Sequence, residues 1–248
     1  MKDLMLTFGV NIAKRFNNRQ KRIFYSYTIP FFEDLGYPVA FQAGANKVSP
    51  VANILIGDLD RAATWVAAPY DTPSKSLLPF RYYPFNRKKN LSQENLNIFL
   101  HFFIYLLFCL VVWYFAARFA GLDRLQQGLG IALMVVLFLL STKLISGFAN
   151  RVNFNKNSAS LALLASLAQR TKGRSDVAYI LLDKSVSSFE GLNTLANSGH
   201  RPPCVFLYLD CLAEGERLAL AHGPKAAGTA AALARPASSS TWTAWPRG

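Results

Sequence analysis

The stretch LNIFLHFFIYLLFCLVVWYFAARFAGLDRLQQGLGIALMVVLFLLSTKLISGFA (96–149) decides how this chain is organised. Residues 98–117 carry no charge, and residues 129–149 carry only Lys143, near the end of the run. About 20 apolar residues in a helix are enough to cross a hydrocarbon core of ~30 Å. Neither run has the polar face that a core helix of a soluble protein shows. We therefore predict a transmembrane helical hairpin in the middle of the chain.

Basic residues flank this hairpin on the side of its two long neighbouring segments. They are Arg81, Arg87, Lys88 and Lys89 before the first run, and Arg151 and Lys156 after the second. The connecting turn holds only Asp123 and Arg124, with Arg118 just before it. Lys and Arg close to the ends of spans accumulate on the cytoplasmic side of a membrane. We expect an integral membrane protein with two spans, both termini cytoplasmic and only the short turn outside.

The composition and charge of the chain indicate which kinds of partner to expect. The chain has 248 residues, of which 52% are hydrophobic, and a net charge of +13. A basic balance can indicate nucleic acid, but much of this charge lies beside the predicted membrane spans, and no basic helix with interleaved aromatic residues occurs. The three cysteines have no metal-ligand spacing, and their odd number is typical of a reducing compartment. We expect the lipid bilayer as a partner, leave a protein partner or a second copy of the chain open, and expect no nucleic acid.

The segments on either side of the hairpin have the pattern of an α/β domain. Short apolar runs, typical of strands, lie at 37–43, 52–58 and 63–71, and again at 176–183 and 204–212. Helical periodicity covers 155–170 and 189–199 between and before the later strands. Strands that alternate with helices favour parallel pairing. Neither half has enough apolar surface to be stable alone, so we predict that residues 37–71 and 176–212 form one sheet.

The composition changes again near the end of the chain. The run AAGTAAALARPASSSTWTAWPRG (226–248) is rich in Ala, Ser and Pro and has no periodicity, which favours a disordered or aberrant tail and a truncated C-terminal part. The expected organisation is an N-terminal half-domain, a transmembrane hairpin, a second half-domain and a tail, at residues 1–95, 96–149, 150–223 and 224–248.

Four segments, in this order, resemble the zinc-dependent aminopeptidase family, which includes the glutamate carboxypeptidases and the transferrin receptor ectodomain. They are NILIGDLDRAATWVAAPYDTP (53–73), NFNKNSASLALLASLAQ (153–169), DVAYILLDKSVSSFEGL (176–192) and VFLYLDCLAEGE (205–216). The resemblance covers roughly residues 20–95 and 150–222. It implies an α/β fold, an aminopeptidase-like sandwich with a mixed sheet, interrupted here by the two-helix hairpin. In active members it implies two zinc ions.

The resemblance also shows where this chain departs from the family pattern. Pro69 stands where the family has the His of an H-x-D motif, and a proline side chain has no donor atom for a metal. Asp71 matches the Asp of that motif, which in the family orients the absent His. Lys156 replaces the bridging Asp, and its ammonium would repel the cations that such a site holds.

The remaining positions of the pattern are equally altered. Lys184 and Ser185 fall where the family has a Glu-Glu pair, so the general base is missing. Glu190 is a displaced carboxylate with no evident role. Asp210 matches a ligand Asp, but His222 follows it too soon to be the family's final His.

The resemblance therefore predicts a vestigial pocket of Asp71, Lys156 and Asp210, with no catalytic residue, no metal ligand set and no cofactor. Simpler interpretations of the three residues are a turn former, a solvated lysine and a loop cap, and an ion pair between Lys156 and either carboxylate stays open. No Ser/His/Asp triad, phosphate-binding loop or Cys/His metal cluster is present in the sequence.

Three functions follow from these patterns. The first is a membrane-tethered, catalytically inactive relative of the zinc aminopeptidases that acts by binding or scaffolding. The second is a membrane-bound zinc metallopeptidase with residual activity. The third is a small membrane subunit of a transport complex, which would need no sheet. We prefer the first hypothesis, because most of the metal ligands and the general base are missing.

Overall fold

The computed structural model describes residues 2–44, 50–75, 77–79, 81, 83, 86–150, 154–185, 188–212, 218–233 and 242–246. The chain forms two compact units. One unit joins Met1–Thr72 to Arg151–Gly248, and the other is the intervening segment Pro73–Asn150. Residues 73–95, predicted as the end of the N-terminal half-domain, fall within the second unit.

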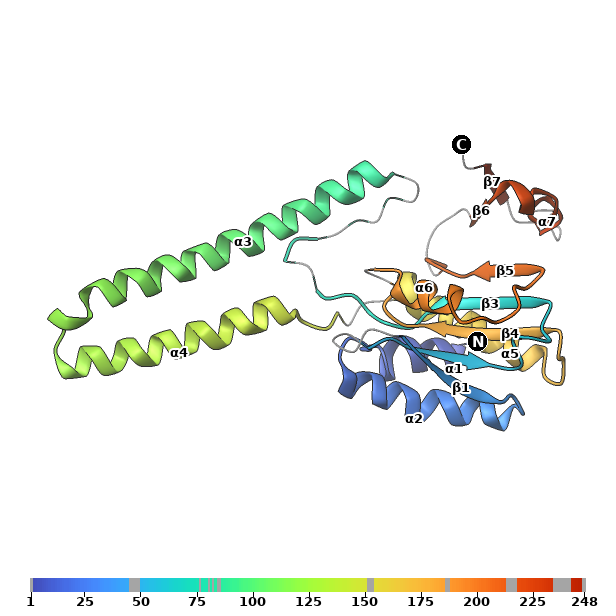
Figure 1. Cartoon of the computed structure of the whole chain (residues 1–248), viewed down its shortest axis with the longest axis horizontal. Coiled ribbons are helices and arrows are strands. Elements are labelled where there is room, and N and C mark those ends of the chain that lie inside the picture. The colour runs from blue at the N-terminus through green and yellow to red at the C-terminus, as the bar shows by residue number, and fades with distance from the viewer. Residues whose placement is uncertain are drawn as a thin grey trace. The chain divides into compact units, whose positions relative to one another are not determined.

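The first unit is built on a five-stranded mixed sheet (Figure 1). Its strands are β1 (Val39–Ala43), β2 (Ala52–Ile56), β3 (Thr64–Pro69), β4 (Val177–Leu182) and β5 (Val205–Tyr208), in the order β1-β2-β4-β3-β5. β3 pairs in parallel with β4 and β5, whereas β2 pairs antiparallel with β1 and β4. Strands from before and after the helical unit belong to the same sheet. The predicted sheet and the mixed α/β class are therefore confirmed.

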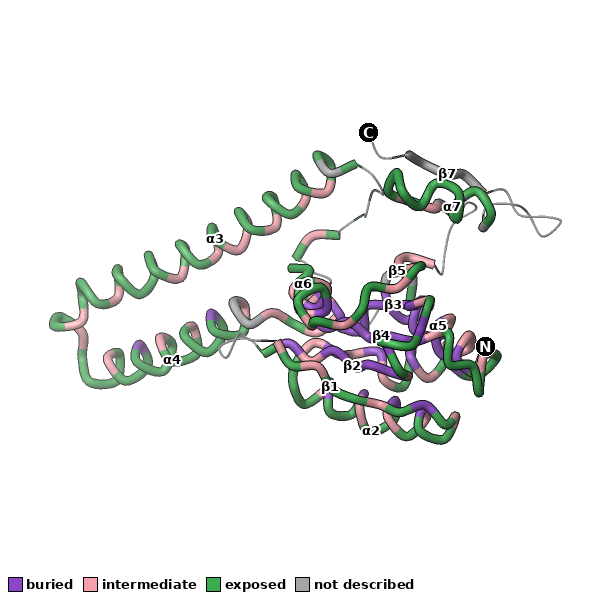
Figure 2. Tube along the Cα trace, turned by 45° about the vertical axis from the view of Figure 1, so that its right-hand side comes forward, coloured by how far each residue is buried: buried purple, intermediate pink, exposed green. Residues whose placement is uncertain are grey.

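Three helices and two π-helical turns cover one face of this sheet. They are α1 (Lys2–Leu6), the turn Thr7–Asn11, α2 (Asn18–Asp34), the turn Phe154–Ser158 and α5 (Ala159–Arg170). α2 begins with a capping box, in which Asn17 and Gln20 bond each other's backbone N–H groups. Phe24 and Phe32 of α2 and Leu164 of α5 are fully or almost fully buried against the sheet. This face forms the larger core (Figure 2).

The other face of the sheet has a smaller core, on which the short helix α6 (Glu190–Ala196) packs. Alternate residues of β3 and β4 point to this side, among them Trp65, Ala67 and Ile180, and Leu195 of α6 packs on them. Because both faces of these central strands are buried, their sequences read as continuous apolar runs rather than as alternating ones.

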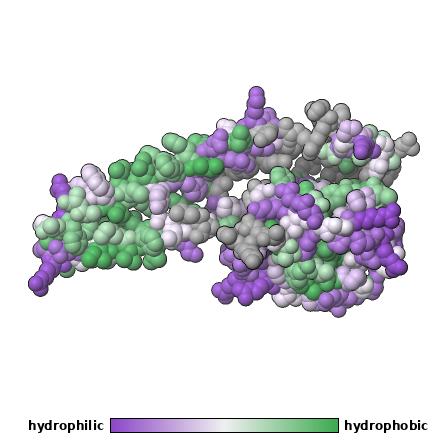
Figure 3. Space-filling view, in the orientation of Figure 1, coloured by the Kyte–Doolittle hydropathy of each residue, from purple (hydrophilic) through white to green (hydrophobic). Residues whose placement is uncertain are grey.

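The second unit is a helical hairpin of α3 (Arg87–Arg118), a 3₁₀ turn (Phe119–Gly121) and α4 (Arg124–Ser146). Two helices are long and apolar enough to cross a membrane, and 0% and 11% of their most apolar windows are buried. Apolar surface covers the unit along its length (Figure 3). Gly130 lies directly against the Phe115 ring, since a Cβ at this glycine would come within 1.5 Å of the ring.

The two ends of the helical unit meet each other. Lys75 donates its backbone N–H to Phe148 at 2.6 Å, Asn150 donates to Pro73 at 3.4 Å, and Ser74 and Ala149 form a β-bridge. The first and last residues of this unit are therefore neighbours in space. Such an insertion leaves the segments before and after it free to form a single α/β domain.

Part of the chain after β5 lies outside the five-stranded sheet. The structure describes a 3₁₀ turn (Pro224–Ala226), α7 (Ala227–Leu233) and β7 (Trp242–Pro246), which pairs in parallel with β6 (Leu218–His222). β6 and β7 form a separate two-stranded sheet. The alanines of α7 have high helix propensity.

Candidate functional site

Two buried carboxylates lie at one edge of the main sheet. Asp71 follows the end of β3, and Asp183 directly follows the end of β4. Because β3 and β4 are parallel neighbours, their carboxyl ends lie at the same edge, where α/β proteins place their sites. Asp71 is 8% exposed and Asp183 is 1% exposed.

Backbone amides bind both carboxylates. Ser185 donates its N–H to Asp71 Oδ1 at 3.1 Å. Asp183 accepts N–H groups from Lys184 at 2.9 Å and from Ala52 at 3.2 Å. Lys184 adopts a left-handed conformation, with φ 46°, to turn the chain over this edge. The first two residues after Asp183 therefore each donate a backbone N–H to one of the two carboxylates.

Two buried cations come from the N-terminal segment. The Lys21 Nζ atom, in the first turn of α2, lies 2.5 Å from Asp183 Oδ1. The Arg15 guanidinium is fully buried and donates to the carbonyl oxygens of Tyr70, Phe8 and Ile12 at 2.6, 2.8 and 2.6 Å. Both cations are desolvated, and each has a partner that offsets this cost: carbonyl oxygens for Arg15, and the Asp183 carboxylate for Lys21.

The charges of this cluster balance. Burial lowers the pKa of Arg15 to about 10, and the negative charge of Asp71 opposes that shift. Among the residues that the structure describes, the buried charged side chains are Arg15, Lys21, Asp71 and Asp183, two cations and two anions. A neutral set of this kind can stay buried without a bound ion. We refer to these four residues as the buried quartet.

Tyrosines and polar side chains surround the buried quartet. The Tyr25 and Tyr70 hydroxyls lie 2.6 Å apart, and the Tyr70 hydroxyl donates to the Ala52 carbonyl at 2.9 Å. Burial raises the pKa of Tyr25 to about 12 and raises that of Tyr70 further. Asn157 donates its amide to the Asp71 carbonyl, and Ser158 accepts from Arg15 at 3.2 Å. These groups act as hydrogen-bond partners of a closed polar core.

The structure brings only part of the predicted pocket into this cluster. Asp71 belongs to it. Asp210 follows β5, the next parallel strand at the same edge, and is half-buried, with the Cys211 Sγ 3.5 Å from its carboxylate. Lys156 lies in the turn before α5, but its side chain, and so the ion pair left open for it, is outside the described residues.

The other positions singled out from the sequence lie elsewhere or are already paired. Pro69 ends β3 and faces Leu182 across the parallel ladder. The Lys184 Nζ atom lies 3.7 Å from a Glu190 carboxylate oxygen, so the displaced carboxylate has a cation beside it. His222 is on β6, in the separate two-stranded sheet.

Sequence reasoning missed three of the four residues of the buried quartet. Asp183 is the last residue of the run 176–183, which was predicted as a strand. Because the carboxyl ends of parallel strands lie at one edge of a sheet, Asp183 could have been placed beside Asp71. Arg15 and Lys21 carried no such signal. They lie in KRFNNRQKR (14–22), where every basic residue has the appearance of a solvated one.

The residues present do not fit a pair of zinc ions. Zinc needs deprotonated oxygen, nitrogen or sulfur donors with free lone pairs directed at one point. Here an ammonium and two backbone N–H groups bind the Asp183 carboxylate. Within the described part of the chain, no group of three or more His, Cys, Asp and Glu side chains could hold a metal ion.

Comparisons with known proteins agree with the fold. No family model matches this chain, and no curated protein matches it. The crystal structure of Macrostomum lignano glutaminyl cyclase is similar, with a TM-score of 0.50 and 10% sequence identity. The similarity covers 100% of this chain and 71% of that chain. The fold is thus that of the aminopeptidase-like α/β proteins, to which this cyclase fold belongs. At such low identity the similarity concerns the fold alone.

Proposed function

We propose that this chain is a membrane-tethered aminopeptidase-like protein that acts by binding or scaffolding, without metallopeptidase catalysis. The observation that supports it most is the Lys21–Asp183 ion pair at the carboxyl edge of the sheet. This ammonium is bonded to Asp183 Oδ1 at the edge where α/β enzymes hold their reacting groups. With that oxygen bonded to a cation, it is not placed to activate a water molecule.

The exposure of α3 and α4 supports the membrane tether. A core helix of a soluble protein is mostly buried, whereas these two helices are almost entirely exposed within the chain. Large apolar side chains such as Phe102, Trp113 and Phe138 are each more than half exposed. A soluble protein seldom exposes a continuous apolar surface of this size. A bilayer would cover it, and the length of each helix suits that role.

The activity experiment uses the full chain, purified in lipid nanodiscs. We expect no hydrolysis of aminoacyl-arylamides with or without added Zn²⁺. Zinc-dependent turnover that a chelator abolishes would instead favour the metallopeptidase with residual activity. We also expect the chain to stay with the membrane in alkaline carbonate, and its release as a soluble protein would contradict the tether.

A further inference from the structure

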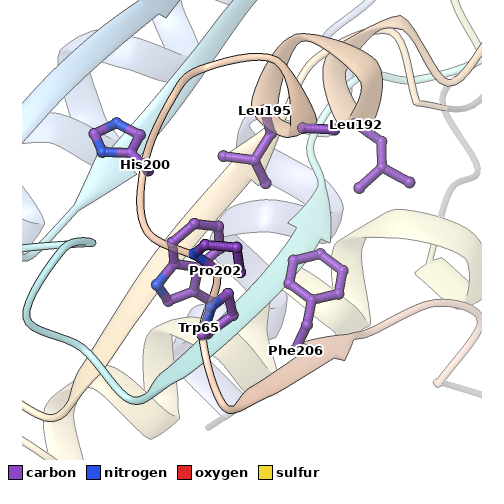
Figure 4. A pocket seen from close by; sticks show the side chains of 8 residues that line it. Trp65, Leu192, Leu195, His200, Pro202 and Phe206 are labelled. Atoms are coloured by element: carbon purple, nitrogen blue, oxygen red, sulfur yellow. The ribbon is translucent and has the colours of Figure 1, made fainter. Parts of the chain in front are cut away.

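A surface pocket lies on the face of the sheet opposite the larger core. Its volume is about 320 Å³, and it opens between α6, the segment after α6, and the strands β3 and β5 (Figure 4). The residues that line it are Trp65, Leu192, Leu195, Ala196, His200, Pro202, Pro203 and Phe206. We call it the Trp65 pocket.

The Trp65 pocket is separate from the buried quartet. Trp65 is the second residue of β3, while Asp71 follows the end of that strand. Six residues of extended strand span ~20 Å. The pocket thus lies toward the amino ends of β3 and β5, and a ligand there would not touch the buried carboxylates.

Hydrogen bonds connect Trp65 on β3 and the segment after α6 to the same turn, which contains Leu59 and Asp60. The Trp65 indole donates to the Leu59 carbonyl at 3.0 Å, which sets the angle of the ring. Asp60 in the same turn accepts from the Arg201 backbone N–H at 3.0 Å and lies 3.1 Å from His200 Nδ1. Preorganised walls lower the entropic cost of binding a ligand.

The lining determines what the pocket can hold. Trp65 and Phe206 contribute aromatic rings, and the proline and leucine side chains contribute apolar surface (Figure 4). The Trp65 N–H is already used. The His200 Nδ1 atom is likewise bonded to Asp60. The pocket therefore offers a ligand mainly apolar and aromatic surface.

We propose that the Trp65 pocket binds one aromatic ring carried by a small uncharged molecule. Its volume is at the small end of ligand sites, which run from ~300 Å³, so it suits one ring system. Ring edges and faces pair favourably with Trp65 and Phe206. The apolar lining disfavours charged ligands, because moving a charge out of water into such a site is costly.

The test measures binding of N-acetyl-L-phenylalaninamide to the full chain in nanodiscs by saturation-transfer NMR, with empty nanodiscs subtracted. We expect saturable, millimolar binding that is weaker for N-acetyl-L-leucinamide. Ala196→Phe, at an exposed position that lines the pocket, fills it and should weaken binding at least about tenfold. Ala40→Phe, at an exposed position on β1 outside the pocket lining, is the matched control and should bind as the unmodified chain does.

A second variant guards against a folding defect in the first. Phe206→Ala removes one aromatic ring from the pocket lining and should weaken binding. Its melting temperature should stay within a few degrees of that of the Ala40→Phe control. Absence of saturable binding in the unmodified chain would overturn the proposal. Equal binding by Ala196→Phe and Ala40→Phe would also overturn it, since the ligand would then lie elsewhere.

Discussion

The Lys21 ammonium lies 2.5 Å from the Asp183 carboxylate, although 162 residues separate the two in sequence. The bond joins α2, before the helical unit, to the end of β4, after it. Both side chains are almost completely buried, at 9% and 1% exposure. The pair therefore fastens the two parts of an interrupted domain at the edge where the resemblance implied metal.

Removing the Lys21 cation should destabilise the fold strongly. Lys21→Met leaves Asp183 buried without its partner, and breaking such a pair costs about 3 kcal/mol. Equilibrium urea unfolding of the full chain in detergent measures the change. Arg19→Met removes an exposed cation from the same helix, so it should cost less than about 0.5 kcal/mol. Equal effects of the two substitutions would mean that the ion pair contributes no more than a surface charge.

Alkaline pH should destabilise the protein through Tyr25. Burial raises its folded-state pKa to about 12 from 10.0, so the folded state binds more protons than the unfolded state between those values. The contribution is fully present below pH 10.0 and is lost as pH rises through about 12. Arg15 acts in the opposite sense, because its folded-state pKa is lowered to about 10. The pKa of Tyr70 is also raised, so two tyrosines act against one arginine between these pH values.

Urea unfolding near pH 9 and near pH 12 checks this expectation. Tyr25→Phe should lose less stability between the two values than the unmodified chain, by about 1 kcal/mol after allowance for its partial exposure. Tyr27→Phe, at an exposed tyrosine of the same helix, is the control and should behave as the unmodified chain does. If Tyr25→Phe has the same pH dependence as the control, the buried tyrosine pair does not govern alkaline unfolding.

The hairpin should depend on close packing at Gly130. A side chain there would collide with the Phe115 ring, so Gly130→Leu should separate α3 from α4. Gly128→Leu, two residues earlier in an open position, should be tolerated. Hydrogen exchange of the turn Phe119–Gly121 in nanodiscs reports the difference, with faster exchange expected only in Gly130→Leu. Unchanged exchange in that variant would contradict the packing.

The orientation of the hairpin can be tested by cysteine labelling in a background without the native cysteines. A membrane-impermeant maleimide added outside cells should label Gln126→Cys in the connecting turn. It should not label Ser74→Cys or Gln169→Cys until the membrane is permeabilised, because basic flanks stay on the cytoplasmic side. Labelling of the latter two positions in intact cells, without labelling of the turn, would reverse the topology.

The sheet could be predicted from the sequence, because its apolar runs are long and bounded by turn residues. TWVAAP (64–69) and VAYILL (177–182) became β3 and β4, paired as parallel neighbours. Their pairing across the helical insertion followed from the surface that each half had to bury. The order of the strands did not follow, because several orders satisfy the same pattern of buried residues.

The candidate site could be predicted only in part, for a physical reason. Asp71 carries a local signal, since it follows a buried strand. The role of Arg15 depends on three carbonyl oxygens and a serine hydroxyl that tertiary folding brings around it. No spacing of residues in the sequence predicts this set of hydrogen-bond acceptors around Arg15. A buried cation is recognised only once the partners that offset its desolvation are known.

Metal content tests the central claim most directly. The full chain, purified without chelator and dialysed against trace zinc, should contain no stoichiometric zinc by elemental mass spectrometry, because Lys21 already binds the Asp183 carboxylate. Pro69→His alone should not restore binding, since it supplies one ligand and leaves the buried cations in place. Two zinc ions per unmodified chain, removed by a chelator together with peptidase activity, would contradict the account.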